Sequence, residues 1–192
     1  MSDILTIDTA SGVITEETIN ELTVYNEYHP LLKEVMPEYT EKLPNENMTV
    51  LLKQMRKTLK QYGAFGLSAN QCNVRKRVFV LGTDQFTISC INPKVIEVDD
   101  TIVKESEGCL SYPGMFLKID RPYSILAEFT DEYGEVKQQR LEGMTARCYM
   151  HELDHMNGVR FVDHVGEASV QVAKRKAEKF IKTFVRTKKA TK

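Results

Sequence analysis

The chain has 192 residues, a formal net charge of −1 and 42% apolar residues. Folding at this size removes roughly 70% of the unfolded surface from water, so these values predict one domain over residues 1–192 with a substantial core. They exclude an intrinsically disordered chain. The longest uninterrupted apolar run is Val78 to Leu81, far shorter than the roughly 20 residues of a membrane-spanning helix.

The N-terminal region and the cysteines indicate the compartment. Six acidic residues and no basic residue precede Lys33, so the positively charged start of a secretory signal is missing. The four cysteines lie far apart without a CxxC pair, which is typical of free thiols in a cytosolic chain. We therefore expect a cytoplasmic protein with no membrane and no DNA partner.

Hydrophobic periodicity predicts a helix and several strands in the first half of the chain. From Met48 to Tyr62 the apolar residues recur at spacings of three and four, and Gly63 is placed to end this amphipathic helix. Short β-type runs follow at Arg77 to Leu81, Phe86 to Ile91 and Val95 to Val98, broken by Gly82, Asn92-Pro93 and Asp99-Asp100.

The second half predicts a hairpin and two further helices. The runs Ser124 to Thr130 and Glu135 to Leu141 flank a turn-type segment, and a buried helix is expected from Thr145 to Asn157, ended by Gly158. A basic, surface-packed helix is expected at about residues 167–188. Its apolar stripe consists of Val170, Ala173, Ala177, Phe180, Ile181 and Phe184. Because strands and helices occupy separate stretches, the fold class is α+β.

The strongest chemical signal is the HExxH sequence from His151 to His155. Two histidines four residues apart on a helix project from one face and can reach the same metal ion. The intervening Glu152 suits a base for a metal-activated water. The pattern predicts a metal site on the buried helix, with small mixed or antiparallel sheets around it.

A catalytic metal site normally needs a third protein ligand. The metzincin pattern fails, since its third histidine would fall at Phe161. Glu178 is a weak candidate, because it lies among lysines on the basic helix. Cys148, three residues before His151, and Cys109, in a loop-like segment from Glu107 to Gly114, are better candidates. The residues alone leave the choice open.

Three separated segments resemble the motifs of the peptide deformylase family. Residues 64–71, with the sequence AFGLSANQ, resemble GxGLAAPQ; residues 107–111 are EGCLS; and residues 150–158 resemble QHExDHxxG. The motifs occur in the family's order, and the similarity covers most of the chain. This chain departs from the family at Ala64, Ser68, Asn70 and Met150, where glycine, alanine, proline and glutamine are usual.

The resemblance implies a metal-dependent hydrolase that removes the formyl group from formylmethionyl nascent peptides and releases formate. Cys109, His151 and His155 then hold a divalent metal. This metal is commonly Fe²⁺ in the family, and Zn²⁺, Ni²⁺ or Co²⁺ can occupy the site. Glu152 moves protons. The oxyanion donors are the Gln71 side-chain amide and the Leu110 backbone N–H.

By family position, five residues approach the methionine side chain of the substrate: Phe65, Gly66, Met144, Arg147 and Cys148. Arg147 is an unexpectedly polar member of this set. The basic tail, with nine Lys or Arg against Glu178 in residues 168–192, has two interpretations. It is a helix with a solvated charged face, or it contacts the ribosome, as the terminal helix does in some bacterial members of the family.

Two other hypotheses remain at this point. One is an HExxH endopeptidase with Glu178 or another acid as third ligand. The other is a non-catalytic, metal-stapled module whose basic tail binds RNA, with Cys148 or His164 completing a four-ligand site.

Overall fold

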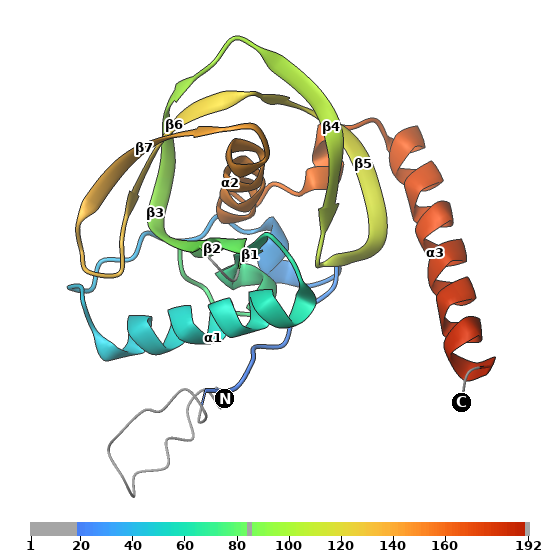
Figure 1. Cartoon of the computed structure of the whole chain (residues 1–192), viewed down its shortest axis with the longest axis horizontal. Coiled ribbons are helices and arrows are strands. Elements are labelled where there is room, and N and C mark those ends of the chain that lie inside the picture. Colours follow the sequence, from blue (N-terminus) through green and yellow to red (C-terminus); the bar gives the residue numbers. More distant parts are fainter. Residues whose placement is uncertain (1–18, 84–85, 191–192) are drawn as a thin grey trace, which may run out of the picture.

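The computed structural model describes residues 19–83 and 86–190. These residues form seven strands, which lie around a central helix (Figure 1). All strand pairings are antiparallel. One sheet has the order β1-β2-β3-β6-β7, and a second sheet consists of β4 and β5. The strands are β1 (Gly66–Ser68), β2 (Val78–Thr83), β3 (Phe86–Val98), β4 (Ile102–Cys109), β5 (Tyr112–Pro122), β6 (Ser124–Thr130) and β7 (Val136–Glu142).

Within residues 19–83 and 86–190, three α-helices accompany these sheets: α1 (Glu46–Tyr62), α2 (Gly143–Met156) and α3 (Glu167–Ala190). The described part of the chain also contains the short 3₁₀ helices η2 (Pro30–Lys33), η3 (Ala69–Cys72) and η4 (Phe161–His164). In Figure 1, α2 lies between the two sheets, α1 crosses below β1 and β2, and α3 stands outside β5. This arrangement confirms the predicted α+β class. No helix among the described residues is long and apolar enough to cross a membrane.

The α1 helix forms where the periodicity predicts it. The Asn45 side chain caps its start by accepting a hydrogen bond of 2.9 Å from the Met48 N–H, and Gly63 ends it with a φ of 59°. The apolar face of the helix packs on β1 and β2. Tyr62 is an exception to the predicted stripe, because its side chain is half exposed.

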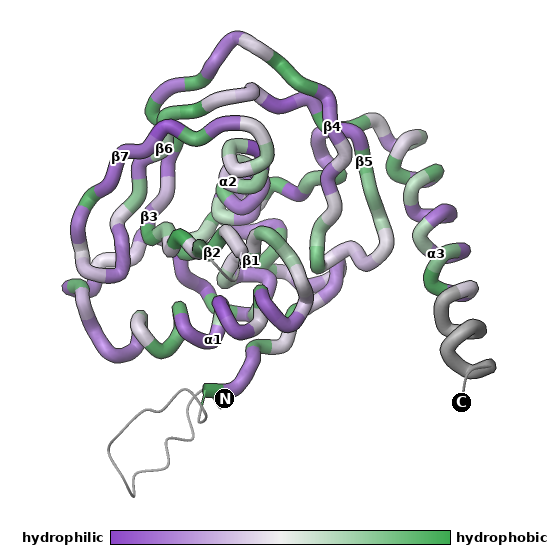
Figure 2. The backbone as a smooth tube through the Cα atoms, viewed as in Figure 1, coloured by the Kyte–Doolittle hydropathy of each residue, from purple (hydrophilic) through white to green (hydrophobic). Residues whose placement is uncertain are grey.

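The core surrounds α2 on most sides. Phe79 of β2 and Tyr149 of α2 meet edge to face in a cluster that also holds residues of β3, β6 and β7. Hydrophobic colour along β2 marks this buried centre in Figure 2, whereas α1 carries much hydrophilic colour. Because α2 is buried on several faces, His151 and His155 lie inside the molecule.

The structure corrects two expectations about strands. The predicted break at Asn92-Pro93 is wrong, since β3 continues through it with a register shift between Ile91 and Lys94. Asn92 takes a φ of 50°, and its side chain bonds both backbone groups of Tyr39. The predicted loop over Glu107 to Gly114 is also wrong: β4 reaches Cys109, β5 begins at Tyr112, and two residues connect them.

The α3 helix packs with only part of its predicted stripe. Ala173 and Ala177 are buried against β5 and η4, but Phe180 is 62% exposed and Ile181 is 40% exposed. The side chain of Phe184 lies outside the described residues. The predicted surface helix is therefore confirmed, and of the predicted stripe residues whose side chains are described, Ala173 and Ala177 are the buried ones.

Candidate metal centre and active site

Cys109, His151 and His155 form the one group among the described residues whose Cys, His or carboxylate atoms gather as a metal site would require. Their ligand atoms lie within 4.8 Å of one another. His151 and His155 come from successive turns of α2, and Cys109 comes from the end of β4. Cys109 Sγ lies 3.3 Å from His155 Nε2. We call these three residues the metal-type group, and Cys148, Glu178 and His164 do not belong to it.

The donor set and its spacing fit a divalent metal. Bonds of about 2.3 Å to sulfur and about 2.0 Å to nitrogen place two tetrahedral ligands about 3.5 Å apart, close to the observed 3.3 Å between Cys109 and His155. Burial, together with the charges of His151 and Arg121, lowers the pKa of His155 well below its usual value. Its imidazole is therefore neutral, which is the form that binds metals.

The charges around His151 favour a cation at the same place. Burial opposes a proton on His151, yet the neighbouring Cys109 and Glu107 raise its pKa well above the usual value. His151 Nδ1 lies 3.0 Å from Glu107 Oε2. This contact orients the ring with its other nitrogen toward Cys109, as second partners of metal-binding histidines commonly do.

Glu107 is held by two buried arginines. Arg121 donates through Nε and Nη2 at 2.9 and 3.1 Å, and Arg147 donates through Nη1 at 2.7 Å. Burial alone would raise the pKa of Glu107, but hydrogen bonds from His151 and Arg121 outweigh it and lower the pKa to about 2. Glu107 is thus ionised under ordinary conditions.

Arg121 also extends this network toward the surface. Its Nη1 donates to Asp154 Oδ2 at 2.7 Å, and the same oxygen lies 2.7 Å from His164 Nε2. His164, which follows His155 by nine residues, therefore contacts Asp154 and is not one of the three ligands. The sequence reasoning missed the role of Arg121. The alternation of Met115, Leu117, Ile119 and Arg121 on one face of β5 is the signal that could have revealed it.

Glu152 is buried beside the three ligands. Burial raises its pKa above the ordinary value, although His151 and the Ser68 hydroxyl act in the opposite direction. Ser68 Oγ donates to Glu152 Oε2 at 2.5 Å. A Cβ at Gly66 would lie 2.3 Å from Glu152 Oε1 and 2.6 Å from Cys148 Sγ, so β1 approaches α2 closely at this glycine.

Gln71 presents its amide to the same centre. The Ser68 N–H donates to Gln71 Oε1 at 2.9 Å, which turns the nitrogen toward the ligands. Gln71 Nε2 lies 3.2 Å from Ser111 Oγ and 3.4 Å from Cys109 Sγ. A fixed N–H donor therefore points at the metal-type group. There it can donate a hydrogen bond to an oxygen that becomes negatively charged during a reaction.

A pocket of about 620 Å³ opens onto this centre. Its walls include Gln71, Cys109, Leu110, His151 and Glu152. The five residues predicted near the methionine side chain, Phe65, Gly66, Met144, Arg147 and Cys148, also line it.

Arg147 differs from the other wall residues. Its side chain is 4% exposed, and besides Glu107 it bonds the backbone oxygens of Ile119 and Val103 at 2.9 and 2.6 Å. The guanidinium therefore faces β4 and β5. Its charge is matched there by Glu107 and by Glu105, whose Oε2 lies 3.2 Å from Arg147 Nε.

A thiol and two imidazoles that fit one metal, beside a buried carboxylate and an amide donor, define the centre of a metal-dependent hydrolase. The family model described as polypeptide deformylase matches residues 20–171. The chain belongs to the peptide deformylase family. It is an enzyme that removes N-formyl groups from nascent peptides, so the endopeptidase and RNA-binding module hypotheses are set aside.

Individual relatives agree with this assignment. The chain is 32% identical to the peptide deformylase of Thermotoga maritima over 142 residues, which cover 74% of this chain and 87% of the relative. It is 38% identical to that of Carboxydothermus hydrogenoformans over 134 residues, covering 70% and 86%.

Solved structures show the same fold. A peptide deformylase from Legionella pneumophila superposes with a TM-score of 0.79 at 27% identity, covering 86% of this chain and 98% of that one. A peptide deformylase from Synechococcus elongatus in complex with actinonin gives 0.77 at 28% identity, covering 82% and 86%.

Proposed function

We propose that Cys109, His151 and His155 hold the metal and that Glu152, Gln71 and Leu110 carry out the deformylation chemistry around it. The observation that supports this most is the approach of the three ligand atoms to within 4.8 Å from separate parts of the chain. When bound, the metal lowers the pKa of a coordinated water and polarises the formyl oxygen.

In this proposal, Glu152 acts first as a base and then as an acid. Its carboxylate takes a proton from the water that attacks the formyl carbon. As the carbon–nitrogen bond breaks, Glu152 returns the proton to the departing amine, leaving formate and a free N-terminus. The raised pKa of Glu152 supports this role, because a base works best with a pKa near the working pH.

The oxyanion that forms on the formyl oxygen needs donors already in place. We assign the Gln71 Nε2–H and the Leu110 backbone N–H to this task. The hydrogen bond from the Ser68 N–H to Gln71 Oε1 supports the first assignment, since it fixes which end of the amide faces the pocket.

We propose that Phe65, Gly66, Met144 and Cys148 form the slot for the methionine side chain. Apolar and small side chains on the pocket wall suit an unbranched thioether. For Arg147 we propose a different task, because its guanidinium donates to Glu107 and to two backbone oxygens. It holds Glu107 against His151 while its aliphatic stem borders the slot.

Formate release from formyl-Met-Ala-Ser tests the proposed function, with an unformylated internal peptide as the control. Formate from the first peptide and no cleavage of the second are the expected results. Cleavage of the internal peptide, or no formate at full metal content, contradicts it.

We further propose Fe²⁺ as the native metal, with Zn²⁺, Ni²⁺ and Co²⁺ as alternatives that the same ligands accept. One thiolate and two imidazoles suit all four ions. An iron centre beside a cysteine ligand is open to oxidation in air. Activity of the iron form should therefore decay faster in air than that of the nickel form, and equal decay contradicts iron.

We also propose that the enzyme works in the cytoplasm and that α3 contacts the ribosome. The support is the nine Lys or Arg in residues 168–192 and the exposure of Lys176 and Lys179 on the described part of α3. Co-sedimentation with ribosomes should fall in Lys176→Glu/Lys179→Glu, while formate release from a free peptide stays unchanged. Unchanged co-sedimentation favours the alternative of a solvated charged face.

A further inference from the structure

The pocket that opens onto the metal-type group has an apolar mouth. Four large apolar side chains line this pocket and are also exposed to solvent: Tyr25 (38% exposed), Tyr62 (50%), Phe116 (66%) and Met144 (57%). They come from the segment before η2, from the end of α1, from β5 and from the start of α2. Single exposed apolar residues are common on proteins, but several around one pocket mark a surface that binds a partner. We call these four residues the apolar mouth.

The charged groups of the same pocket lie deeper. Among the described residues that line it, the Asp, Glu, Lys, Arg and His residues are Glu107, Arg147, His151 and Glu152, and all four are buried. Glu107 pairs with Arg147 and with His151, and Glu152 accepts a hydrogen bond from Ser68. A peptide that crosses the mouth of the pocket therefore meets apolar side chains there, while the charged side chains of the lining are engaged with one another inside.

The ring of Phe116 is held beside the metal-type group. Gly108 of β4 and Phe116 of β5 are partners in the strand register, and a Cβ at Gly108 would lie 2.8 Å from Phe116 Cε1. The ring therefore lies against the backbone of Gly108, the residue before Cys109, and the missing side chain of the glycine leaves room for it. Phe116 is thus exposed to solvent and yet fixed at the pocket.

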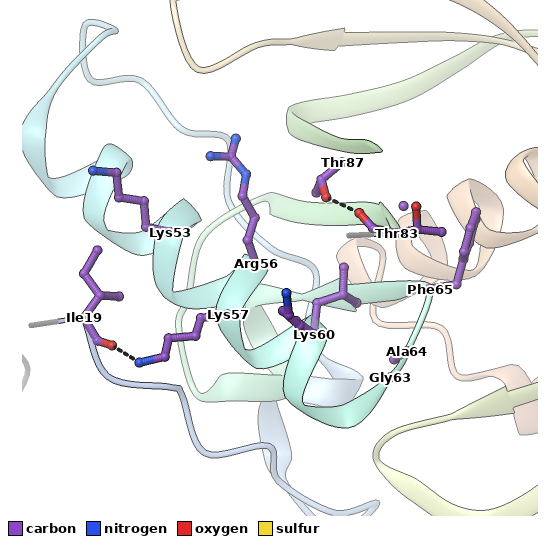
Figure 3. A pocket seen from close by; sticks show the side chains of 12 residues that line it. Ile19, Lys53, Arg56, Lys57, Lys60, Gly63, Ala64, Phe65, Thr83 and Thr87 are labelled. Carbon is purple, nitrogen blue, oxygen red and sulfur yellow. Dashed lines mark hydrogen bonds between the residues drawn. The ribbon is translucent and has the colours of Figure 1, made fainter. Parts of the chain in front are cut away.

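The segment of residues 19–25 brings Tyr25 to the same pocket. At one end of the segment, Lys57 Nζ of α1 donates to the backbone oxygen of Ile19 at 2.7 Å, a contact drawn as a dashed line in Figure 3. At the other end, the Tyr25 N–H donates to the backbone oxygen of Gln71 at 2.8 Å. The centre of the Tyr25 ring lies 4.5 Å from that of His29. The segment is thus attached to α1 and to η3, and it fixes Tyr25 next to the residue whose amide faces the metal-type group.

We propose that the apolar mouth binds an apolar side chain at the second or third position of the formylated peptide, and that Tyr25 and Phe116 set this preference. The enzyme then selects nascent chains in which an apolar residue closely follows the formylmethionine. This rests on the proposed function, which puts the formyl group at the metal-type group and the methionine side chain in its slot. An extended chain advances about 3.3 Å per residue, so the next two residues lead from the slot to the mouth of the same pocket.

Formate release from two pairs of peptides tests the inference. Formyl-Met-Leu-Ser and formyl-Met-Asn-Ser compare the second position, and formyl-Met-Ala-Leu and formyl-Met-Ala-Asn compare the third, because Leu and Asn have similar shapes but differ in polarity. Full burial of a leucine side chain strengthens binding about tenfold or more, so partial cover at an open mouth should raise kcat/KM for Leu about threefold to tenfold above Asn in at least one pair. The difference should lie in KM, since contacts remote from the formyl group bind ground state and transition state alike.

The variant Tyr25→Ala/Phe116→Ala should bring the Leu-to-Asn ratio close to one. Tyr25→Leu/Phe116→Leu keeps an apolar mouth and should retain most of the ratio, which separates an apolar contact from a disturbed pocket. The matched control Phe86→Ala/Tyr133→Ala removes two exposed aromatic rings outside the described lining and should keep the wild-type ratio. Equal kcat/KM for Leu and Asn in both wild-type pairs overturns the inference, as does an unchanged ratio in Tyr25→Ala/Phe116→Ala.

Calorimetric affinities for the unformylated peptides Met-Leu-Ser, Met-Asn-Ser, Met-Ala-Leu and Met-Ala-Asn separate this inference from the proposed function, because their binding needs no turnover. No formate from any formylated peptide contradicts the proposed function, whereas tighter binding of a Leu peptide that Tyr25→Ala/Phe116→Ala removes still supports the apolar mouth. Normal formate release together with equal affinities and equal kcat/KM for Leu and Asn leaves the proposed function in place and overturns the inference alone.

Discussion

The hydroxyl of Ser68 donates a hydrogen bond of 2.5 Å to Oε2 of Glu152, and both residues are buried. The contact joins β1 to α2 across 84 residues of sequence. It matters for catalysis because a proton-transferring carboxylate must keep its position relative to the substrate. In this chain a serine supplies that contact where the family motif usually has alanine.

Ser68→Ala should lower kcat/KM about threefold to tenfold, since Glu152 loses one orienting hydrogen bond while its carboxylate remains. Metal content and fold should stay unchanged. Formate release at matched metal content is the measurement, with the exposed Ser169→Ala as control. A loss as large as that of removing Glu152 itself would show that Ser68 does more than orient.

Gly66→Ala should reduce turnover more than stability. The new Cβ would lie 2.3 Å from Glu152 Oε1, and that oxygen is the end of a side chain that can move aside. We expect kcat to fall by about 10² or more as the carboxylate is displaced, with a small change in melting temperature. Gly166→Ala is the matched control, because nothing lies within 4 Å of its Cβ position. Normal turnover in Gly66→Ala would show that the carboxylate that transfers the proton is not that of Glu152.

Cys109→Ala should abolish metal retention, whereas Cys148→Ala should keep it. Cys109 reaches the two histidines from the end of β4, while the Cys148 thiol, whose pKa is raised well above normal by burial, packs in the core around α2. The metal content per chain of the two purified variants shows which cysteine is the third ligand. Retention in the first variant and loss in the second would reverse the ligand assignment.

The helices and the histidine pair could be predicted from the sequence because local spacing determines them. The i, i+4 spacing of His151 and His155 fixes their common face once α2 forms. The choice between Cys109 and Cys148 could not be made locally. It depends on the end of β4 reaching α2, a contact between segments more than 40 residues apart in the chain.

The exposed strand β4 shows why part of the fold could not be predicted from the sequence. β4 is mostly exposed and rich in charge, so it lacks the apolar alternation of a half-buried strand. β5 does alternate, with Met115, Leu117 and Ile119 buried. This alternation indicates that Arg121 is buried, but its ion pairs join positions 14 and 33 residues apart, and no spacing rule in the sequence identifies those partners.

Gln71→Ala should lower kcat by about 10² to 10³ with little effect on peptide affinity. The lost N–H donor strengthens its bond only as the oxyanion forms. Single-turnover kinetics and peptide calorimetry at matched metal content separate the two effects, and the exposed Gln139→Ala serves as control. A raised KM with unchanged kcat would make Gln71 a substrate-binding residue instead.

Formate release by Glu152→Ala at full metal content tests most directly whether this centre hydrolyses the formyl group as proposed. The variant should fold, keep its metal and bind a formyl-methionyl peptide, because Glu152 is outside the three-ligand group. Its turnover should nonetheless fall by roughly 10² to 10⁴ or more, the usual contribution of a positioned base that also serves as acid. Near-normal formate release from Glu152→Ala with its metal in place would contradict the proposed mechanism.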